Sequence, residues 1–524
     1  MNAFYLIIIP AVCTAFYSCN TGIPDYPIDP VPFSSVKVND DFWNTRLETN
    51  RKITIPYGFE MCEKTGRIDN FLIAGGLKAG RFCSTYPFDD SDVYKIIEGA
   101  SYSLATDDDP ALDRYLDSLI EFIAAAQEDD GYLETWRTID PDKPLAEWWG
   151  TAERWSNLPY GHELYNAGHL YEAAVAHYQA TGKNSLLNIA LKNAGLVCDV
   201  FGPGKKSGVP GHEEIEIGLM KLFRTTNDKK YLDMAGYFIE QRGKTVNRES
   251  GGEYNQDHLP VREQREAVGH AVRAGYLYSS IADFSSITGD TTFYAGLKAT
   301  WNDIVNHKLY ITGGVGARGE GESFGKPYDL PNATAYAETC AAISMVLWND
   351  RMFRLTGESK YIDFLERTLY NGFLSGVGLD GRSFFYTNPL ESDGTASANY
   401  DTPVRQPWFT CACCPSNIAR FIPQIPGFIY AIKYNLIYVN LYISNKAVIE
   451  AAGTRVYLNM DSGYPWDGKT VIHVDPDEPE DFGIAFRVPG TVTGKLTGDS
   501  LYRILDPEKA QVSLSVNGRP VKWA

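Results

Sequence analysis

Apolar side chains between residues 100 and 370 recur at steps of three and four, which is the period of an amphipathic helix. In HELYNAGHLYEAAVAHY the residues Leu164, Ala167, Leu170, Tyr171 and Val175 follow this spacing. EEIEIGLMKLFR and GHAVRAGYLYSSIADF show the same period. The pattern predicts a succession of helices through this part of the chain.

A short phrase separates these helices and recurs along the chain. Gly or Asn past a helix end supplies a left-handed residue, and Asp or Ser caps the next helix. Five such turns, with the helices near Asp41–Lys64, predict six helical hairpins closed into an (α/α)6 barrel, or toroid, over residues 28–424. An open helical solenoid is the alternative. The phrases are YQATGKNSLL from Tyr178, FRTTNDKKYL from Phe223, SSITGDTTFY from Ser285, FRLTGESKYI from Phe353 and the weaker SLATDDDPAL from Ser103.

The pattern changes after Ile422 to alternation of apolar and polar residues, which is typical of strands. YNLIYVNLYIS, TRVYLNM, FGIAFRVPG and VSLSVNGRPV predict an antiparallel β-sandwich module over residues 425–524. Asn517-Gly518 is a hairpin signal, and the sequence ends six residues after Gly518. The module is therefore expected to be incomplete.

Composition and the first residues narrow the class of protein. The net charge of −18 argues against a nucleic-acid surface, which needs clustered Lys and Arg. An aromatic content of 13% slightly favours a sugar-binding cleft. The apolar run from Phe4 to Phe16, followed by Ser18-Cys19, predicts a signal peptide and lipobox over residues 1–19. We expect export, with a lipid anchor at Cys19, as a periplasmic or outer-membrane-anchored lipoprotein.

The stretch WFTCACCPSN places three cysteines within four positions. Pro415 should push Cys414 out of helical backbone, so a turn is needed for both adjacent thiols to reach one point. Far upstream, Glu338 and Cys340 would lie on one side of an extended segment that enters a helix near Ala341. Together with Cys413 and Cys414 they form one carboxylate and three thiols, a set that suits tetrahedral Zn²⁺. Buried free cysteines, a vicinal disulfide and a disulfide to Cys340 are the alternatives.

The sequence gives weaker support for catalytic or ligand roles of other acidic residues and of the histidines than for the thiol cluster. Glu322 lies in the Gly-rich stretch GARGEGESFG, where Glu320 is an equal choice. Such carboxylates are usually solvated. Histidines in helical stretches are more often core or cap residues than ligands; here they are His162, His169, His212 and His270.

The chain from about Asp41 onward resembles glycoside hydrolase family 127 and the related family 146, the β-L-arabinofuranosidase families. The resemblance rests on long motifs in the family's order. They are DDFWNTR, DSDVYKIIEGA, EDDGYLETW, HELYNAGHL, PGHEEIEIGL, VREQREAVGHAVRA, GESFG, PYDLPNATAYAETCA, FFYTNPL and CACCPSNIAR. The resemblance implies an (α/α)6 barrel followed by β-sandwich modules, and hydrolysis of β-L-arabinofuranosides or related L-sugars of plant glycans.

The resemblance also implies roles for individual residues. Zinc would be held by Glu338, Cys340, Cys413 and Cys414, with Cys413 as nucleophile and Glu322 as acid/base of a retaining mechanism. His162, His212, His270 and Tyr386 would line the sugar pocket, and Cys411 has no assigned role. A carboxylate pair of Glu322 and Glu338 is the rival within the class. A glycan-binding lipoprotein with structural zinc, or an (α/α)6 lyase or epimerase, is the rival outside it. The sequence does not set the exact sugar or the oligomeric state.

Overall fold

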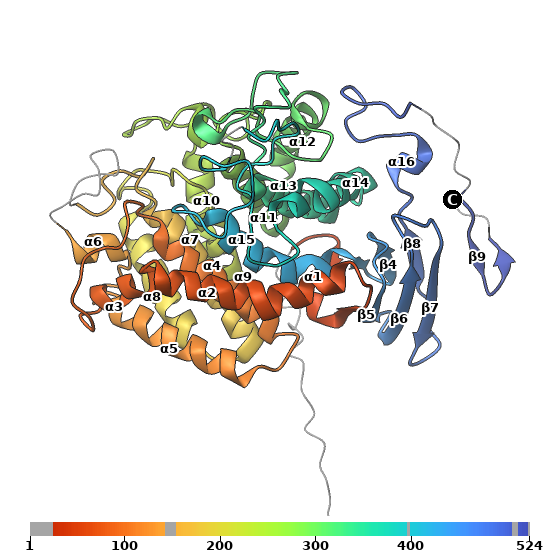
Figure 1. Cartoon of the computed structure of the whole chain (residues 1–524), viewed down its shortest axis with the longest axis horizontal. Coiled ribbons are helices and arrows are strands. Elements are labelled where there is room, and N and C mark those ends of the chain that lie inside the picture. The colour runs from red at the N-terminus through yellow and green to blue at the C-terminus, as the bar shows by residue number, and fades with distance from the viewer. Residues whose placement is uncertain (1–24, 142–152, 396–398, 506–511, 522–524) are drawn as a thin grey trace, which may run out of the picture.

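The computed structural model describes residues 25–141, 153–395, 399–505 and 512–521, so that the leader with Cys19 lies outside it. The chain is helix-rich, and the strands that follow the helices lie together beside them, at the right of Figure 1. Within the described ranges, no helix combines the length and apolar character needed to cross a membrane.

The recurring phrases end helices, as the sequence predicted. Gly182, Asn227, Gly289 and Gly357 each adopt the left-handed conformation at a helix C-terminus. The weaker copy at Ser103 also follows a helix, but without a left-handed residue. The resulting helix pairs are α2 (Ile55–Lys64) with α3 (Arg67–Ala74), α4 (Asp89–Leu104) with α5 (Pro110–Ala126), α7 (Glu163–Thr181) with α8 (Ser185–Val200), α9 (Ile215–Thr226) with α10 (Lys229–Gln241), α11 (Ala271–Thr288) with α12 (Tyr294–Asp303), and α13 (Thr339–Thr356) with α14 (Ser359–Arg367). The other helices are α1 (Trp43–Thr49), α6 (Thr135–Ile139), α15 (Cys413–Phe421) and α16 (Gly490–Thr493).

The first helices of the five later pairs, together with α15, pack on one another in a ring, and α2 is not part of this ring. α4 packs on α7, α7 on α9, α9 on α11, α11 on α13 and α13 on α15, and α15 packs back on α4. α4, α7 and α11 are buried along nearly their whole length, as is typical of helices surrounded by others. The second helices, such as α5, α8 and α10, keep an exposed face. α8 and α10 lie against their own partners, whereas α5 packs mainly on α3.

The contact between α4 and α15 is especially close. A Cβ atom at Gly99 of α4 would lie 2.5 Å from the carbonyl oxygen of Ala419 on α15. Beside it, the buried Arg420 of α15 forms ion pairs with Glu98 of α4 at 2.8 Å and with Glu172 of α7 at 2.6 Å. Glycine at position 99 therefore lets α15 approach α4 closely, and the buried ion pairs of Arg420 fix the orientation of α15 relative to α4 and α7.

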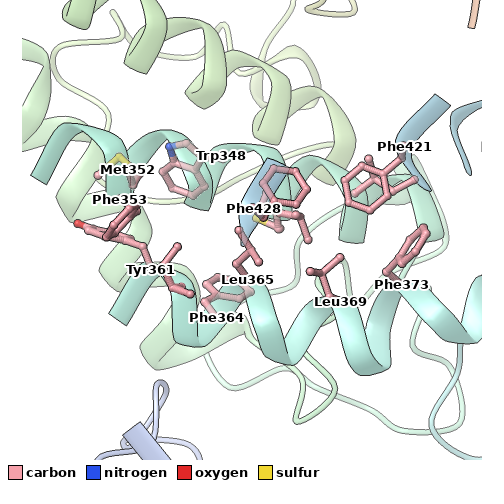
Figure 2. Packing of buried hydrophobic residues seen from close by; sticks show 14 of the residues in the cluster. Trp348, Met352, Phe353, Tyr361, Phe364, Leu365, Leu369, Phe373, Phe421 and Phe428 are labelled. Atoms are coloured by element: carbon pink, nitrogen blue, oxygen red, sulfur yellow. The ribbon is translucent and has the colours of Figure 1, made fainter. Parts of the chain in front are cut away.

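Aromatic packing adds to the contacts at the C-terminal end of α15. Figure 2 shows buried side chains of α13 and α14 facing one another, continued by Leu369 and Phe373 of the π-helical segment Thr368–Phe373. The Phe373 and Phe421 rings meet edge to face, with their centroids 4.7 Å apart. Phe421 is the last residue of α15, so this contact fixes the helix at its C-terminal end.

Within the described residues, the strands form two four-stranded sheets, with orders β1-β3-β4-β8 and β2-β5-β6-β7, and a two-stranded sheet of β9 and β10. The sequence did not predict β1 and β2, which come from the N-terminus and pair with β3 and β5. β8 pairs parallel with β4, so the expected all-antiparallel arrangement is wrong at this edge. Asn517-Gly518 joins β9 to β10 in a hairpin, as predicted. The strands are β1 (Asp29–Pro30), β2 (Val36–Val38), β3 (Tyr430–Lys433), β4 (Leu436–Val439), β5 (Asn445–Ala451), β6 (Thr454–Ser462), β7 (Thr470–Pro476), β8 (Gly483–Phe486), β9 (Ser515–Val516) and β10 (Arg519–Pro520).

Gly99→Ala should destabilise the protein by about 2 kcal/mol, because the added methyl group must push α15 away from α4. Gly195→Ala on α8 is the matched control, since no atom lies within 4 Å of the position that its added methyl group would take. That variant should be neutral or up to about 1 kcal/mol more stable. Urea unfolding of both variants measures the difference, and equal stabilities would contradict the role given to the close approach.

Candidate active site

The N-terminal turns of α13 and α15 bring together Glu338, Cys340, Cys413 and Cys414. The Sγ atom of Cys340 lies 3.3 Å from that of Cys414 and 3.9 Å from that of Cys413, and the two adjacent thiols are 4.0 Å apart. Glu338 Oε1 lies 3.5 Å from Cys414 Sγ and 3.8 Å from Cys413 Sγ. Residues separated by more than 70 positions thus form one group of possible metal ligands.

The backbone at these residues differs from the prediction. α15 begins at Cys413, so Cys414 is helical despite Pro415. The prediction that Pro415 keeps Cys414 out of a helix was wrong, because Pro415 lies in the first turn, where no backbone N–H is needed for the helix. The first turn, and not an extended segment, therefore turns both thiols toward one point. Glu338 is extended as predicted, but α13 already begins at Thr339 and includes Cys340.

All seven cysteines of the described residues are free thiols. The sulfur separations in the cluster exceed the S–S bond length of about 2.05 Å, which excludes both disulfide alternatives here. Glu338 Oε2 is buried and has no hydrogen-bond partner in the described chain. An uncompensated carboxylate oxygen beside three sulfurs fits a site that holds a cation.

The thiols differ in their pKa values. Burial raises the pKa values of Cys413 and Cys414. Burial also opposes ionisation of Cys340, but hydrogen bonds from the other two thiols lower its pKa to about 6. Burial, followed by the charge of Glu322, raises the pKa of Glu338 well above its ordinary value. Without a cation, the cluster therefore favours mostly protonated groups. The helix N-termini, which stabilise thiolates, act in the opposite direction.

Glu322 lies opposite this cluster, in the 3-10 turn Glu320–Glu322. Its backbone is left-handed, with φ at 50°, an uncommon and strained conformation for a residue with a side chain. Its Oε2 atom is 2.7 Å from Nε2 of His270. His270 Nδ1 accepts a hydrogen bond from the backbone N–H of Val272, so Nε2 carries the proton donated to Glu322.

The hydrogen-bond partners decide the charge of Glu322. Burial raises its pKa, but His270, the hydroxyl of Tyr336 and the charge of Arg273 outweigh burial and lower it to about 2. Burial lowers the pKa of His270, and the charge of Glu322 opposes this shift. In the free protein, Glu322 is therefore a carboxylate that accepts a hydrogen bond from His270.

Tyr386 reaches the cluster from a loop attached to the start of α13. The N–H of Thr339 donates to the carbonyl of Tyr386 at 3.0 Å. The Tyr386 hydroxyl lies 2.9 Å from Cys413 Sγ and 3.5 Å from Cys411 Sγ. The tyrosine thus fixes the direction of the Cys413 thiol, and Cys411 is a second partner of the hydroxyl.

These groups line a cavity of about 160 Å³. It contains Glu322, Glu338, Cys340, Cys413, Tyr386 and the three predicted histidines His162, His212 and His270. Cys414, Glu320 and His169 do not line it; His169 is buried instead 3.1 Å from Glu214. Nine lining residues were not predicted from the sequence. Five of them lie inside the quoted family motifs, namely Lys95, Tyr165, Val272, Arg273 and Asn417; the other four are Phe88, Tyr160, Tyr254 and Tyr276. Tyr336, two positions before Glu338 in another quoted motif, was not predicted either.

A small cavity between a carboxyl group and a second set of acidic groups, lined by aromatic rings and histidines, is the kind of site that glycoside hydrolases use. The chain matches the family models "Beta-L-arabinofuranosidase, GH127 catalytic domain" over residues 35–427 and "Beta-L-arabinofuranosidase, GH127 middle domain" over residues 436–524. It therefore belongs to glycoside hydrolase family 127.

Individual relatives agree with this assignment. The chain is 34% identical over 534 residues to the non-reducing end beta-L-arabinofuranosidase of Bifidobacterium longum subsp. longum, covering 93% of this chain and 77% of the relative. A solved GH127 beta-arabinofuranosidase is 50% identical, with a TM-score of 0.89, over 95% of this chain and 77% of the other. A solved GH127 beta-L-arabinofuranosidase from Geobacillus stearothermophilus T6 is 39% identical, with a TM-score of 0.84, over 93% of this chain and 77% of the other.

Replacing His270 by alanine should raise the pKa of Glu322 from about 2, because burial then acts with one fewer opposing hydrogen bond. Carbon-13 NMR of protein with labelled glutamate carboxyls measures the change against pH. His258→Ala is the control, since His258 is a partly buried histidine that does not line the cavity. A Glu322 resonance that titrates at the same pH in both variants would contradict the proposed origin of the low pKa.

Proposed function

We propose that this glycoside hydrolase is a zinc-dependent, retaining exo-enzyme that removes terminal β-L-arabinofuranosyl or related L-sugar residues from plant glycans. Cys413 is its nucleophile and Glu322 its acid/base. The proposal rests on one observation, which is that both side chains line the same small cavity. Cys413 reaches it from the start of α15, and Glu322 from the 3-10 turn Glu320–Glu322. The name of the Bifidobacterium longum relative, a non-reducing end enzyme, supports the choice of sugar and of terminal cleavage.

Glu338, Cys340, Cys413 and Cys414 would hold the zinc. Tetrahedral zinc–sulfur bonds of about 2.3 Å place neighbouring sulfurs about 3.8 Å apart. The three sulfur separations of 3.3, 3.9 and 4.0 Å scatter around this value. When bound, zinc supplies the positive charge that keeps these thiols deprotonated in a site where burial alone protonates Cys413.

Cys413 is favoured as nucleophile by its exposure. Cys340 and Cys414 are buried, whereas Cys413 is partly exposed and lines the cavity. The Tyr386 hydroxyl at 2.9 Å holds its sulfur in place. Its sulfur attacks the anomeric carbon, so that a C–S bond forms as the glycosidic C–O bond breaks.

Glu322 must carry a proton for this first step. Both ring nitrogens of His270 are already engaged, so an added proton resides on the carboxyl group of Glu322. The Glu322 side chain is 32% exposed, and a sugar that fills the cavity removes that part from water. Desolvation raises the pKa of Glu322 toward the protonated form. Glu322 then gives its proton to the departing oxygen.

The second step reverses these roles. Glu322, now a carboxylate held by His270 and Tyr336, takes a proton from water. The water oxygen attacks the anomeric carbon, the C–S bond breaks, and the sulfur of Cys413 leaves with the electron pair. Two displacements at one carbon retain its configuration, with cysteine in the position that a second carboxylate usually holds.

Two rivals remain to be separated by experiment. Oxygens of Glu322 and Glu338 lie within 4.8 Å of each other, so a pair of carboxylates is geometrically feasible. Glu338 is nevertheless buried beside Cys413 and Cys414, where it would have to give up its place in the metal cluster to attack a sugar. The rival outside the class is glycan binding without catalysis around a structural zinc.

Architecture and location complete the proposal. The helix pairs within residues 28–424 are proposed to form an (α/α)6 barrel, and residues 425–524 a β-sandwich module to which β1 and β2 are added. The packing of α15 on α4 supports closure over an open solenoid. Export, with acylation of Cys19, is proposed from the leader pattern alone.

Cys413→Ala should lower kcat on an aryl β-L-arabinofuranoside by about four orders of magnitude, because the attacking atom is removed. Cys198→Ala, a partly exposed thiol on α8, should leave it unchanged. Glu322→Gln with a good leaving group should release one equivalent of phenol and leave one anhydropentose on the peptide that contains Cys413, as measured by mass spectrometry. Full activity of Cys413→Ala would show that Glu322 and Glu338 act as a catalytic carboxylate pair instead. If the unaltered protein hydrolysed no substrate, the rival function of glycan binding without catalysis would be supported.

The purified protein should contain one zinc ion per chain, and Cys414→Ser should lower this content because one of four ligands is weakened. Cys62→Ser is the control, since Cys62 is equally buried but lies away from the cluster. Metal analysis by mass spectrometry measures both variants. Equal zinc in the Cys414 and Cys62 variants would place the metal elsewhere.

A further inference from the structure

A second hollow lies on the outer face of the sheet β2-β5-β6-β7, whose strands β5, β6 and β7 are at the right of Figure 1. It has a volume of about 720 Å³ and shares no lining residue with the catalytic cavity. Its polar floor consists of side chains that alternate with the buried residues of the same strands. The proposed chemistry leaves this surface unused.

A row of hydrogen-bond donors crosses this hollow. Lys37 of β2 is opposite Lys446 of β5, which is opposite Asn459 of β6, which in turn is opposite His473 of β7. All four side chains are exposed. With strands about 4.8 Å apart, the row is about 14 Å long. This length suits an extended ligand of several units better than a single small ion.

The positive charge of this row has no ion-pair partner among the described residues. Neither Lys37 nor Lys446 forms an ion pair with them, and the Asn459 and His473 side chains make no hydrogen bond to them. Like charges directly opposite on neighbouring strands cost stability. The pair is also a local excess of positive charge on a chain whose net charge is −18. An uncompensated lysine pair in a hollow is therefore suited to an anion from outside.

The next row along the strands adds a different kind of group. Tyr457 of β6 is opposite Val448 of β5 and Asp475 of β7, and all three line the hollow. Tyr457 is 38% exposed, so its ring is available to pack on the C–H face of a sugar. Asp475 can accept hydrogen bonds from hydroxyl groups. An acidic peptide or a nucleic acid would gain little from this carboxylate, whereas a sugar that carries both carboxylates and hydroxyls uses every group.

We propose that this hollow, defined by Lys37, Lys446, Tyr457, Asn459, His473 and Asp475, binds an oligosaccharide containing uronic acid units. The lysines receive the carboxylates, Tyr457 packs on a pyranose ring, and Asp475 accepts from hydroxyl groups. The site holds the acidic part of a plant glycan while the catalytic cavity acts on a terminal sugar. It extends the proposed function, but its test requires binding alone and is independent of turnover.

The test measures binding of a de-esterified oligogalacturonide to the full chain by isothermal titration calorimetry. The double variant K37A/K446A should weaken binding at least about tenfold, and Tyr457→Ala should weaken it several-fold. The same oligosaccharide with methyl-esterified carboxyls should bind the unaltered protein no better than the double variant binds the acid form. Lys469→Ala is the matched control, an exposed lysine at the β6–β7 end of the same sheet that does not line the hollow.

The thermal stability of the same variants shows whether the lysines stabilise the folded protein instead of binding a ligand. K37A/K446A should have a Tm equal to or above that of the unaltered protein, because a like-charge pair is removed. A lower Tm, no binding of the oligogalacturonide, or equal weakening in Lys469→Ala would each overturn the proposal. So would analytical ultracentrifugation that shows a dimer dissociated by K37A/K446A, since the hollow would then be covered by a second copy.

Discussion

The site depends on one packing constraint, which is that α13 and α15 begin at the same place. Their first residues are separated by more than 70 positions, and every atom of the thiol cluster belongs to one of these two helix starts or to the residue that precedes α13. Glycine at position 99 lets α15 approach α4 closely, and Arg420 joins α15 to two neighbouring helices through buried carboxylates. Removing one partner of such a buried ion pair leaves an unpaired charge, so alternative positions of α15 are costly.

The same constraint gathers possible metal ligands into one buried cluster of acidic groups. Three sulfurs and a carboxylate are brought within hydrogen-bonding range in a volume from which water is largely excluded. Burial raises the pKa values of Glu338 and Cys413 and so favours their protonated forms. His270 and Tyr336 lower the pKa of Glu322 and so keep it ionised. Two groups of acids a few ångströms apart therefore have opposite protonation tendencies in the free protein, and the proposed first step requires both to be reversed.

Local sequence rules explain the helical part of the fold well, because they act over a few residues. The Thr-Gly phrases at Gly182, Gly289 and Gly357 end helices where the sequence placed them, since a left-handed residue is needed there. The rule about proline failed at Pro415, because its effect depends on whether it falls in the first turn or later. Strands β1 and β2 were missed because two or three residues carry no period, and only their distant partners define them.

The candidate site likewise contains some residues that the sequence alone could group and others that it could not. Glu338, Cys340 and the adjacent thiols could be grouped from their chemistry, because few ligand sets combine one carboxylate with three sulfurs. Family motifs were needed to prefer Glu322 over Glu320, and the structure shows why the two differ: only Glu322 lines the cavity and meets His270. Tyr336 and Arg273 were not assigned roles because a tyrosine or arginine within a helical or loop motif has no spacing that distinguishes it from a packing residue.

The N-terminal strands have a consequence for how the molecule is made. β1 and β2 are made first, but they pair with strands about 400 residues further along the chain, so they have no partners until β3 and β5 have emerged. Contacts this far apart in sequence form slowly, and unpaired strand edges favour association between chains. Chaperone protection is therefore valuable throughout the synthesis of the helical part. For the same reason, the strand-rich segment is not a separable unit, since expressed alone it would lack the two strands that cover its edges.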